Sequence, residues 1–314
     1  MLPVAPSSRP APGGDDPLAP LLDLPGVRDA VDRARTACEE LRWHEAFRRR
    51  WREVRAEADV RAARASAAVD GARVPLEVLR GVATGVDRVA PGAGAAGPAG
   101  VQADDAGPRT AGPVDLRVAT GALRATTLAA TWRPDLGARS EPALPPLGQL
   151  LARLHAAAGA RWLPDADLGR VRTEDAPPRD LTGLGAAPGG SEAAARLALL
   201  TRTVGTTRAP ALVVAAVVHG ELLAVRPFAA ANGTVARAAA RLLLCARGLD
   251  PTGAVVPEVG WAAAPVPYLA TAARFATGTP EGVAAWVGAC ADGVVAGAAE
   301  ARRVADAVLA GRLG

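Results

Sequence analysis

No stretch of this chain alternates apolar and polar residues for long enough to found a β-sheet. Its apolar residues are mostly Ala, Val and Leu, with no Ile at any position, and they recur at helical spacing. We therefore expect a mainly α fold, a helical bundle with at most a short β-hairpin. The predicted helices cover residues 27–69 (one or two helices), a segment behind Pro75, 116–130, 147–158, 192–204, 210–225, 235–247, 268–276 and 281–309, the last with a break near Gly293 or Gly297.

Composition divides the 314 residues into four segments. Residues 1–26 have the composition of a disordered tail, and residues 27–90 that of an N-terminal helical segment. Residues 91–113 are almost all Gly, Ala, Pro and small polar residues, which predicts a flexible linker. Residues 114–314 then form the main helical domain, in which the turn-rich region 165–190 is expected to be a short hairpin or a loop.

The basic residues do not by themselves indicate a protein that binds nucleic acid. All 36 are arginine, a skew typical of high-GC coding, and the net charge is only +4. Arginines gather at residues 48–52 between Trp43 and Trp51, but neighbouring glutamates neutralise much of that charge. We expect a solvated helix face with two core tryptophans there.

The cysteines and the apolar segments favour a protein of the reducing cytoplasm. The cysteines are odd in number, far apart and set among apolar residues, which indicates neither a disulfide framework nor a zinc cluster: Cys38, Cys245 and Cys290. The first residues lack the basic and continuous apolar regions of a secretory signal. The most apolar stretch, 209–225, is too short and too polar to span a membrane, so no membrane partner is expected.

The segment 211–244 carries the clearest chemical signal. An apolar helix ends before Pro227, a loop of small residues contains Asn232 and Gly233, and a second helix begins at once. Free backbone amides and the positive end of the helix dipole meet at such a point, which predicts a site for an anion. The same pattern also suits a plain connection between two helices, with Asn or Gly in a left-handed conformation.

The residues of this loop resemble the Fic (Fido) family, whose members transfer a nucleotide phosphoryl moiety, usually AMP from ATP, to a protein hydroxyl. The family motif His-Pro-Phe-x-Asp/Glu-Gly-Asn-Gly-Arg-x-x-Arg aligns with the string RPFAAANGTVAR at 226–237. Five defining positions are retained: Pro227, Phe228, Asn232, Gly233 and Arg237. Outside the motif, LLARLHAAAG, LGRVRT and YLATAARFATGTPEGVAAWVGACADGV, with Tyr268 and Trp286, are similar to the family's flanking elements. The resemblance covers about 116–299 and implies a Fic-like helical bundle.

An upstream segment resembles the inhibitory helix of many Fic proteins, whose pattern is Ser/Thr-x-x-x-Glu-Gly/Asn. Here Ser66, Asp70 and Gly71 stand at the patterned positions, with Asp in place of Glu. The resemblance implies that these residues are regulatory and that Asp70 pairs with Arg237, where it would block the γ-phosphate of a nucleotide. Taken without the resemblance, the segment is equally a helix that ends in an Asp-Gly turn.

Four substitutions in the motif remove the groups on which the family reaction depends. The resemblance implies a histidine base, and Arg226 at that position stays protonated and cannot take a proton. Ala230 replaces the acid that would hold Mg²⁺ and offers no oxygen ligand. Ala231 replaces a Gly that lets the loop approach a phosphate, and Thr234 replaces the first arginine. We therefore expect no catalytic residue and no metal site.

What remains is an anion nook formed by Asn232, Gly233, the amides that follow them, Arg237 and Arg226. We predict a catalytically degenerate Fic-fold protein, a pseudoenzyme that binds a protein partner, with or without ATP or another nucleotide. One alternative is an active transferase that modifies a protein hydroxyl by altered, metal-independent chemistry. Another is a DNA-binding regulator, and a homodimer is compatible with the family resemblance.

The histidines are predicted to be structural. His219 lies about 10 Å before Arg226 along the same helix, too far for it to replace the missing base. His155 has no carboxylate or cysteine near it in sequence to form a catalytic pair, and His44 is likewise expected to be structural.

Overall fold

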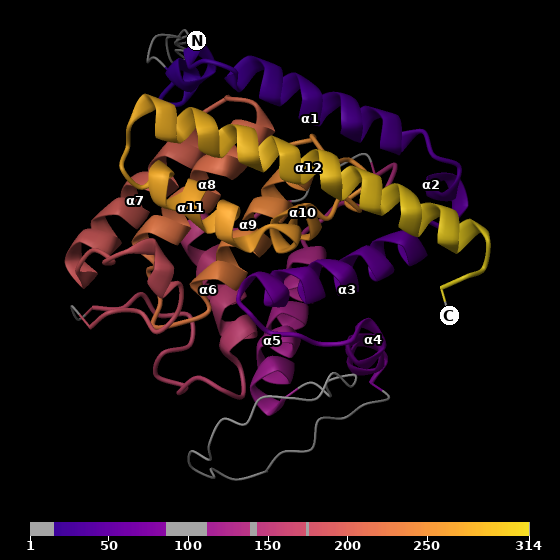
Figure 1. The fold of residues 1–314 in the computed structure, drawn as a ribbon, viewed down its shortest axis with the longest axis horizontal. Helices are drawn as coiled ribbons and strands as arrows, with labels where there is room; N and C mark the ends of the chain where they lie inside the picture. The colour runs from indigo at the N-terminus through magenta and orange to yellow at the C-terminus, as the bar shows by residue number, and fades with distance from the viewer. Residues whose placement is uncertain (1–15, 86–111, 139–142, 174–175, 314) are drawn as a thin grey trace, which may run out of the picture.

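A computed structural model describes residues 16–85, 112–138, 143–173 and 176–313, and within these ranges every regular element is a helix (Figure 1). The elements are η1 (Ala19–Asp23), α1 (Val27–Arg42), α2 (Ala46–Arg49), α3 (Trp51–Val69), α4 (Leu76–Thr84), α5 (Pro113–Ala130), α6 (Leu147–Gly159), η2 (Thr182–Leu184), α7 (Gly190–Thr206), α8 (Ala211–Val225), α9 (Asn232–Ala246), α10 (Pro257–Ala263), α11 (Pro265–Phe275) and α12 (Pro280–Leu309). The mainly α prediction is confirmed.

Two fully enclosed helices form the centre of the molecule. Every residue of α8 except Ala211 and Glu221 is buried, and in α9 only Ala246 is not. The two helices pack against each other, with α5 and α6 against α9 and α12 against α8. Since the loop 226–231 joins α8 to α9, it is held by two helices that the rest of the fold surrounds.

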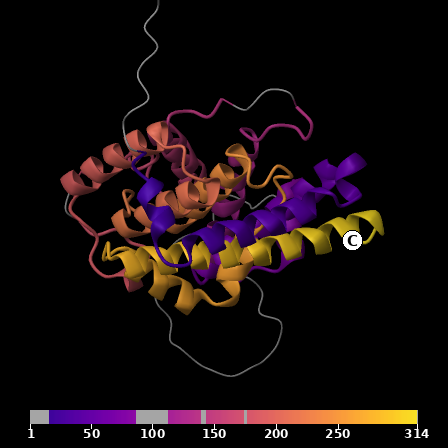
Figure 2. The same ribbon diagram turned by 90° about the horizontal axis from the view of Figure 1, so that it is seen from above.

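Helix α12 runs along one side of the molecule next to α1, as both views show (Figures 1 and 2). The predicted break near Gly293 or Gly297 is wrong, because α12 continues unbroken from Pro280 to Leu309. These glycines instead permit close packing. A Cβ on Gly297 would lie 2.5 Å from the carbonyl carbon of Val256, and one on Gly293 would lie 2.5 Å from the Trp261 indole nitrogen.

The N-terminal helices belong to the same core as the rest of the chain. Helix α3 packs on α5, α10 and α12, and side chains from α1 and α3 share one apolar cluster with α8 and α9. Residues 27–69 form three helices rather than one or two. Residues 1–15 lie outside the described residues, whereas residues 16–26, expected in the tail, include η1 and the buried Leu18.

Three further expectations differ from or are refined by the structure. Trp43 is 74% exposed, with the Arg42 guanidinium over its ring, so it is not a core residue. Trp51 is half-buried beneath Arg52 and Arg55. Of the hairpin or loop predicted at 165–190, the described residues show a loop with the short turn η2 and no strand. The predicted linker 91–113 lies outside the described residues except for its last two positions.

Helix α12 is also long and apolar enough to cross a membrane by length and composition alone. Half of its most apolar window is buried inside the protein, against α1, α8, α10 and α11. Burial of this kind accounts for the apolar composition without a membrane.

A matched pair of glycine substitutions tests the packing of α12. Gly297→Ala is expected to lower the free energy of unfolding by about 2 kcal/mol or more, because the new methyl meets the backbone at Val256. The new methyl of Gly288→Ala on the same helix meets nothing within 4 Å. This variant should raise the free energy of unfolding by up to about 1 kcal/mol, because alanine has the higher helix propensity. Urea unfolding of both variants measures the difference, and equal effects would contradict the close packing.

Candidate functional site

The Asn232 side chain closes the loop between α8 and α9 by two hydrogen bonds to the backbone of Phe228. Asn232 accepts a hydrogen bond at Oδ1 from the Phe228 amide (2.9 Å) and donates one from Nδ2 to the Phe228 carbonyl oxygen (2.9 Å). The loop enters and leaves through left-handed residues, since φ is 46° at Arg226 and 61° at Ala231. The only asparagine in the chain therefore sets the shape of the loop.

His155 of α6 supports the loop from the other side. Its ring stacks on Phe228 at a centroid distance of 4.1 Å. Its Nδ1 accepts a hydrogen bond from the Gly169 amide (2.9 Å), so its Nε2 carries the proton and donates to the Ala230 carbonyl oxygen (3.1 Å). Burial lowers the pKa of His155 to about 4. A neutral ring with both nitrogens engaged has a structural role, as predicted.

The first amides of α9 are occupied by a carboxylate of the chain itself. Asp180 accepts a hydrogen bond at Oδ2 from the Asn232 backbone amide (2.6 Å) and one at Oδ1 from the Asn232 side-chain amide (2.8 Å). Burial raises the pKa of Asp180, although the Asn232 and Gly233 donors oppose the shift. The group that the N-terminus of α9 holds is thus the Asp180 carboxylate.

Asp180 was not singled out by any sequence signal and lies in the turn-rich region, 52 residues before Asn232. Two backbone contacts bring its loop to the motif: the Arg172 amide donates to the Pro227 carbonyl oxygen, and the Arg179 amide donates to the Ala229 carbonyl oxygen, both at 2.9 Å. No pattern of spacing connects these residues. Only a general expectation, that a buried helix N-terminus attracts an acid, could have suggested such a partner.

The structure brings Arg237 together with the predicted regulatory helix. Arg237 is fully buried on α9, where its Nε donates to Ser66 Oγ (2.8 Å) and its Nη2 to Asp70 Oδ2 (2.5 Å). Burial alone would lower the pKa of Arg237, but the Asp70 carboxylate outweighs it and raises that pKa. Gly71, also predicted as regulatory, follows α3 with φ at 90° and ends the helix.

Gly233 allows the ion pair to sit against the first turn of α9. A Cβ at this position would lie 2.9 Å from both Asp70 Oδ1 and Arg237 Nη1. Any side chain here would displace the ion pair, so the residue has a packing reason to be glycine. Thr234, at the family's first arginine position, offers only a long hydrogen bond to Asp70 (3.4 Å).

Arg226 lies at the end of α8 with its side chain turned toward the loop that contains Asp180. It is 2% exposed, and its Nη1 donates to the Leu181 carbonyl oxygen (3.1 Å) while its Nε has no partner among the described residues. Burial lowers the pKa of Arg226, and the nearby Asp180 carboxylate opposes that shift. Arg226 therefore stays a cation beside the loop.

His219 is a packed residue, as predicted. It is fully buried among Trp261, Tyr268 and Trp286, and its Nε2 lies 2.7 Å from Tyr268 Oη. Burial holds the pKa of His219 well below its ordinary value. The third histidine, His44, is a partner of Asp306 at 3.0 Å on the outer helices.

The residues of the nook do not fit a Mg²⁺–ATP complex. Ala230 presents a methyl group at the position where the family resemblance implies a metal ligand, and hydrogen bonds within the chain already use the Asn232 amide and the Nε and Nη2 groups of Arg237. The Asp70 and Asp180 carboxylates would repel a phosphate that approached these donors. Within the described ranges, no group of three or more His, Cys, Asp and Glu side chains is placed to hold a metal ion.

Comparison with known proteins shows the fold. No family model matches the sequence, and no curated protein matches it either. Among solved structures, Fic-1 of C. elegans (residues 134–508) has a TM-score of 0.61 at 16% identity, covering 93% of this chain and 75% of that one.

Two bacterial structures agree. A Fic family protein from Desulfovibrio desulfuricans G20 has a TM-score of 0.56 at 18% identity over 95% of this chain and 77% of that one. A Fic domain containing signaling protein from Bacteroides thetaiotaomicron has a TM-score of 0.60 at 13% identity over 88% of this chain and 98% of that one. The predicted Fic-like helical fold is confirmed, and at these identities the likeness concerns the fold alone.

A double-mutant cycle tests the ion pair between Asp70 and Arg237. Asp70→Ala leaves the fully buried Arg237 without its counter-charge, which should lower the free energy of unfolding by about 3 kcal/mol. Asp70→Ala combined with Arg237→Met should cost less than Asp70→Ala alone, as chemical denaturation would show. Additive costs would contradict the coupling. Asp23→Ala at the exposed Arg28–Asp23 pair is the control and should change stability little.

A second pair of variants tests the backbone of the loop. Ala231→Gly relieves a left-handed alanine and is expected to leave stability unchanged or raise it by up to about 1 kcal/mol. Ala238→Gly in the middle of α9, at the same 8% exposure, should lower it by about 1 kcal/mol. Thermal unfolding of both variants separates the two effects, and the same loss in each would mean that Ala231 is unstrained.

Proposed function

We propose that this chain, which has the fold of Fic proteins, no longer transfers nucleotides and acts as a regulatory module that binds a protein partner. One observation carries the proposal: carboxylates of the chain itself hold the donors that would face a phosphate. Asp180 takes the amides of Asn232, and Asp70 takes the guanidinium of Arg237. A nucleotide would have to displace both carboxylates before it reached the nook.

The chemistry at the loop supports the same conclusion. Transfer to a hydroxyl needs a group that accepts its proton, and Arg226 stays charged at any working pH. The nearest histidine in the loop's hydrogen-bond network, His155, uses both ring nitrogens to hold backbone atoms. Loss of a general base typically lowers the rate by about 10²–10⁴, and loss of electrostatic stabilisation adds a comparable factor.

A binding role needs neither the base nor the metal. The nook residues that remain, Asn232 and Arg237, are used to fix the loop and to join α3 to α9, which are structural tasks. One of the structures with this fold is described as a signaling protein. A scaffold that keeps these contacts while lacking catalytic groups is suited to present its surface to a partner.

Transfer and nucleotide binding can be tested together. Purified protein incubated with ATP labelled at the α-phosphate, with and without Mg²⁺, should acquire no label and pass none to added proteins. Its thermal midpoint should not move with ATP, ADP or AMP, because the carboxylates close the nook. Any partner found by cross-linking in the source cells should bind without added nucleotide.

Two variants decide the interpretation of a positive signal. Label that disappears in Arg237→Ala but persists in Arg202→Ala, an exposed arginine on α7, would overturn the proposal in favour of the altered transferase. A nucleotide-dependent rise in the midpoint with the same dependence on Arg237 would show an open nook. Affinity for DNA that falls steeply with salt would instead support a DNA-binding regulator.

A further inference from the structure

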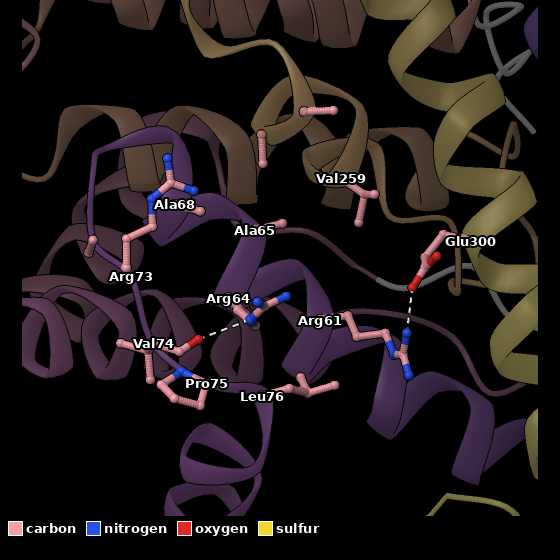
Figure 3. Close-up of a pocket in the computed structure, with 13 residues that line it drawn as sticks. Arg61, Arg64, Ala65, Ala68, Arg73, Val74, Pro75, Leu76, Val259 and Glu300 are labelled. Atoms are coloured by element: carbon pink, nitrogen blue, oxygen red, sulfur yellow. Dashed lines mark hydrogen bonds and ion pairs between the residues drawn. The ribbon is translucent and has the colours of Figure 1, made fainter. Parts of the chain in front are cut away.

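A cavity lies on the far side of α3 from the nook. It has a volume of about 560 Å³ and is bounded by α3, the turn into α4, α10 and α12 (Figure 3). Its position on α3 follows from helical spacing, since Arg61, Arg64, Ala65 and Ala68 share one face. Ser66 and Asp70, which hold Arg237, lie on the opposite face. We call this cavity the α3–α10 groove.

The groove combines an apolar floor with a basic mouth. Small and aliphatic side chains line it from both sides: Ala65, Ala68, Val74, Leu76, Val259 and Ala262. The carboxylate among its lining residues, Glu300, accepts hydrogen bonds from Arg61 (2.6 Å) and from Arg303. Its charge is therefore matched within the protein, at the end of the groove where Figure 3 shows the Arg61–Glu300 pair.

Two arginines at the other end are matched by no acid. Arg64 donates from Nε to the Val74 carbonyl oxygen (2.9 Å), which orients its guanidinium and leaves its Nη groups for another acceptor. Arg73 is exposed and has neither a hydrogen bond nor an ion pair among the described residues. Figure 3 shows the two guanidinium groups apart, with Arg73 at the edge of the groove. The Arg64 guanidinium, oriented by Val74, suits a carboxylate or a phosphate, which both accept hydrogen bonds from arginine in pairs, and Arg73 adds positive charge at the same end.

We propose that the α3–α10 groove binds a small organic anion, a molecule with an apolar body on the alanine-rich floor and a carboxylate or phosphate that accepts hydrogen bonds from Arg64 and is attracted by the positive charge of Arg73. The volume lies within the range of small-molecule sites, and an apolar lining with a few polar groups at one end is their usual composition. The groove and the nook share no lining side chain, so this proposal stands apart from the proposed function.

Binding in the groove would also restrain α3. A ligand that contacts Arg64, Ala65 and Ala68 holds the helix that carries Asp70 to Arg237. Amide hydrogen exchange along α3 and the turn after it is therefore expected to slow when the groove is filled.

The experiment uses 8-anilinonaphthalene-1-sulfonate, a fluorescent molecule with an apolar body and one anionic group. The full chain should bind it with a saturable rise in fluorescence. Arg64→Ala with Arg73→Ala should raise the dissociation constant about tenfold or more, because the hydrogen-bond donors of Arg64 and the positive charge of Arg73 are removed. The matched control, Arg153→Ala with Arg202→Ala, removes two exposed arginines elsewhere and should leave it unchanged.

A steric variant keeps the test decisive if loss of charge disturbs the fold. Ala263→Trp places a large ring at an exposed position of the groove and should weaken binding of the probe with every arginine retained. Equal binding by the wild type, the double-arginine variant and Ala263→Trp would overturn the proposal, because the probe would then lie elsewhere.

Displacement of the probe identifies the chemistry of the occupant. Phenyl phosphate and phenylacetate should compete with it, and whichever competes more strongly distinguishes a phosphate ligand from a carboxylate. Benzyl alcohol, which has a similar body without charge, should not compete. If benzyl alcohol displaces the probe as strongly as the anions do, the arginines do not bind the ligand's anionic group and the proposal is overturned. If only a hexaglutamate peptide displaces the probe, the proposal of a small-molecule ligand is overturned in favour of an acidic peptide.

Discussion

The buried guanidinium of Arg237 is the interaction on which the arrangement of this protein depends. A charge that is removed from water on all sides is tolerated only with a matched partner, and Arg237 finds its partners on α3, 171 and 167 residues away in the chain. The requirement ties the N-terminal helices to the centre of the bundle. It explains why α3 lies against α9 at the point where α9 begins, and why glycine stands at position 233.

The same logic governs the start of α9. A helix N-terminus enclosed in protein offers free amides and a positive dipole, and these must be satisfied by an anion. Asp180 supplies it from a loop that runs beside the motif, while Asn232 closes the loop on itself. The nook is therefore a site for two negative charges that the chain fills with its own side chains. The positive charge at this point and the carboxylates that neutralise it therefore have one physical origin.

Small residues make the close packing of the bundle possible. Alanine-rich helices approach closely, and at Gly293, Gly297 and Gly121 a single methyl group would collide with a neighbouring helix or side chain. Arginine complements this core by reaching carbonyl oxygens that no helix satisfies, as Arg55 does at Thr252 and Pro251 and Arg241 at Val255. Arginine that looked like surplus charge in the composition is in part an internal hydrogen-bond donor.

Much of the local structure followed from the sequence alone. Helical spacing gave the main helices of the C-terminal half to within a few residues, apart from α10, which is only seven residues long. The loop before α9 was also predicted, because the residues that indicate it, Pro227, Asn232 and Gly233, are close together in the chain. The predicted helix break at Gly293 or Gly297 was wrong. Glycine has a low helix propensity, but at these two positions it is needed because neighbouring residues pack too closely for a side chain. The prediction for Trp43 was wrong because composition does not show whether a residue in the turn after a helix meets the core.

The sequence by itself determined the helical class, the arginine at position 226 and the alanine at position 230, and the other residues of the loop, since each depends on the identity of a residue or on local periodicity. Only the tertiary structure decided that Asp180 fills the helix terminus, that Gly233 accommodates the ion pair, and that α3 separates the nook from a second, basic groove. These contacts depend on which distant segments of the chain lie next to each other. Packing and the need to neutralise buried charge determine that arrangement, and the spacing of neighbouring residues in the sequence does not show it.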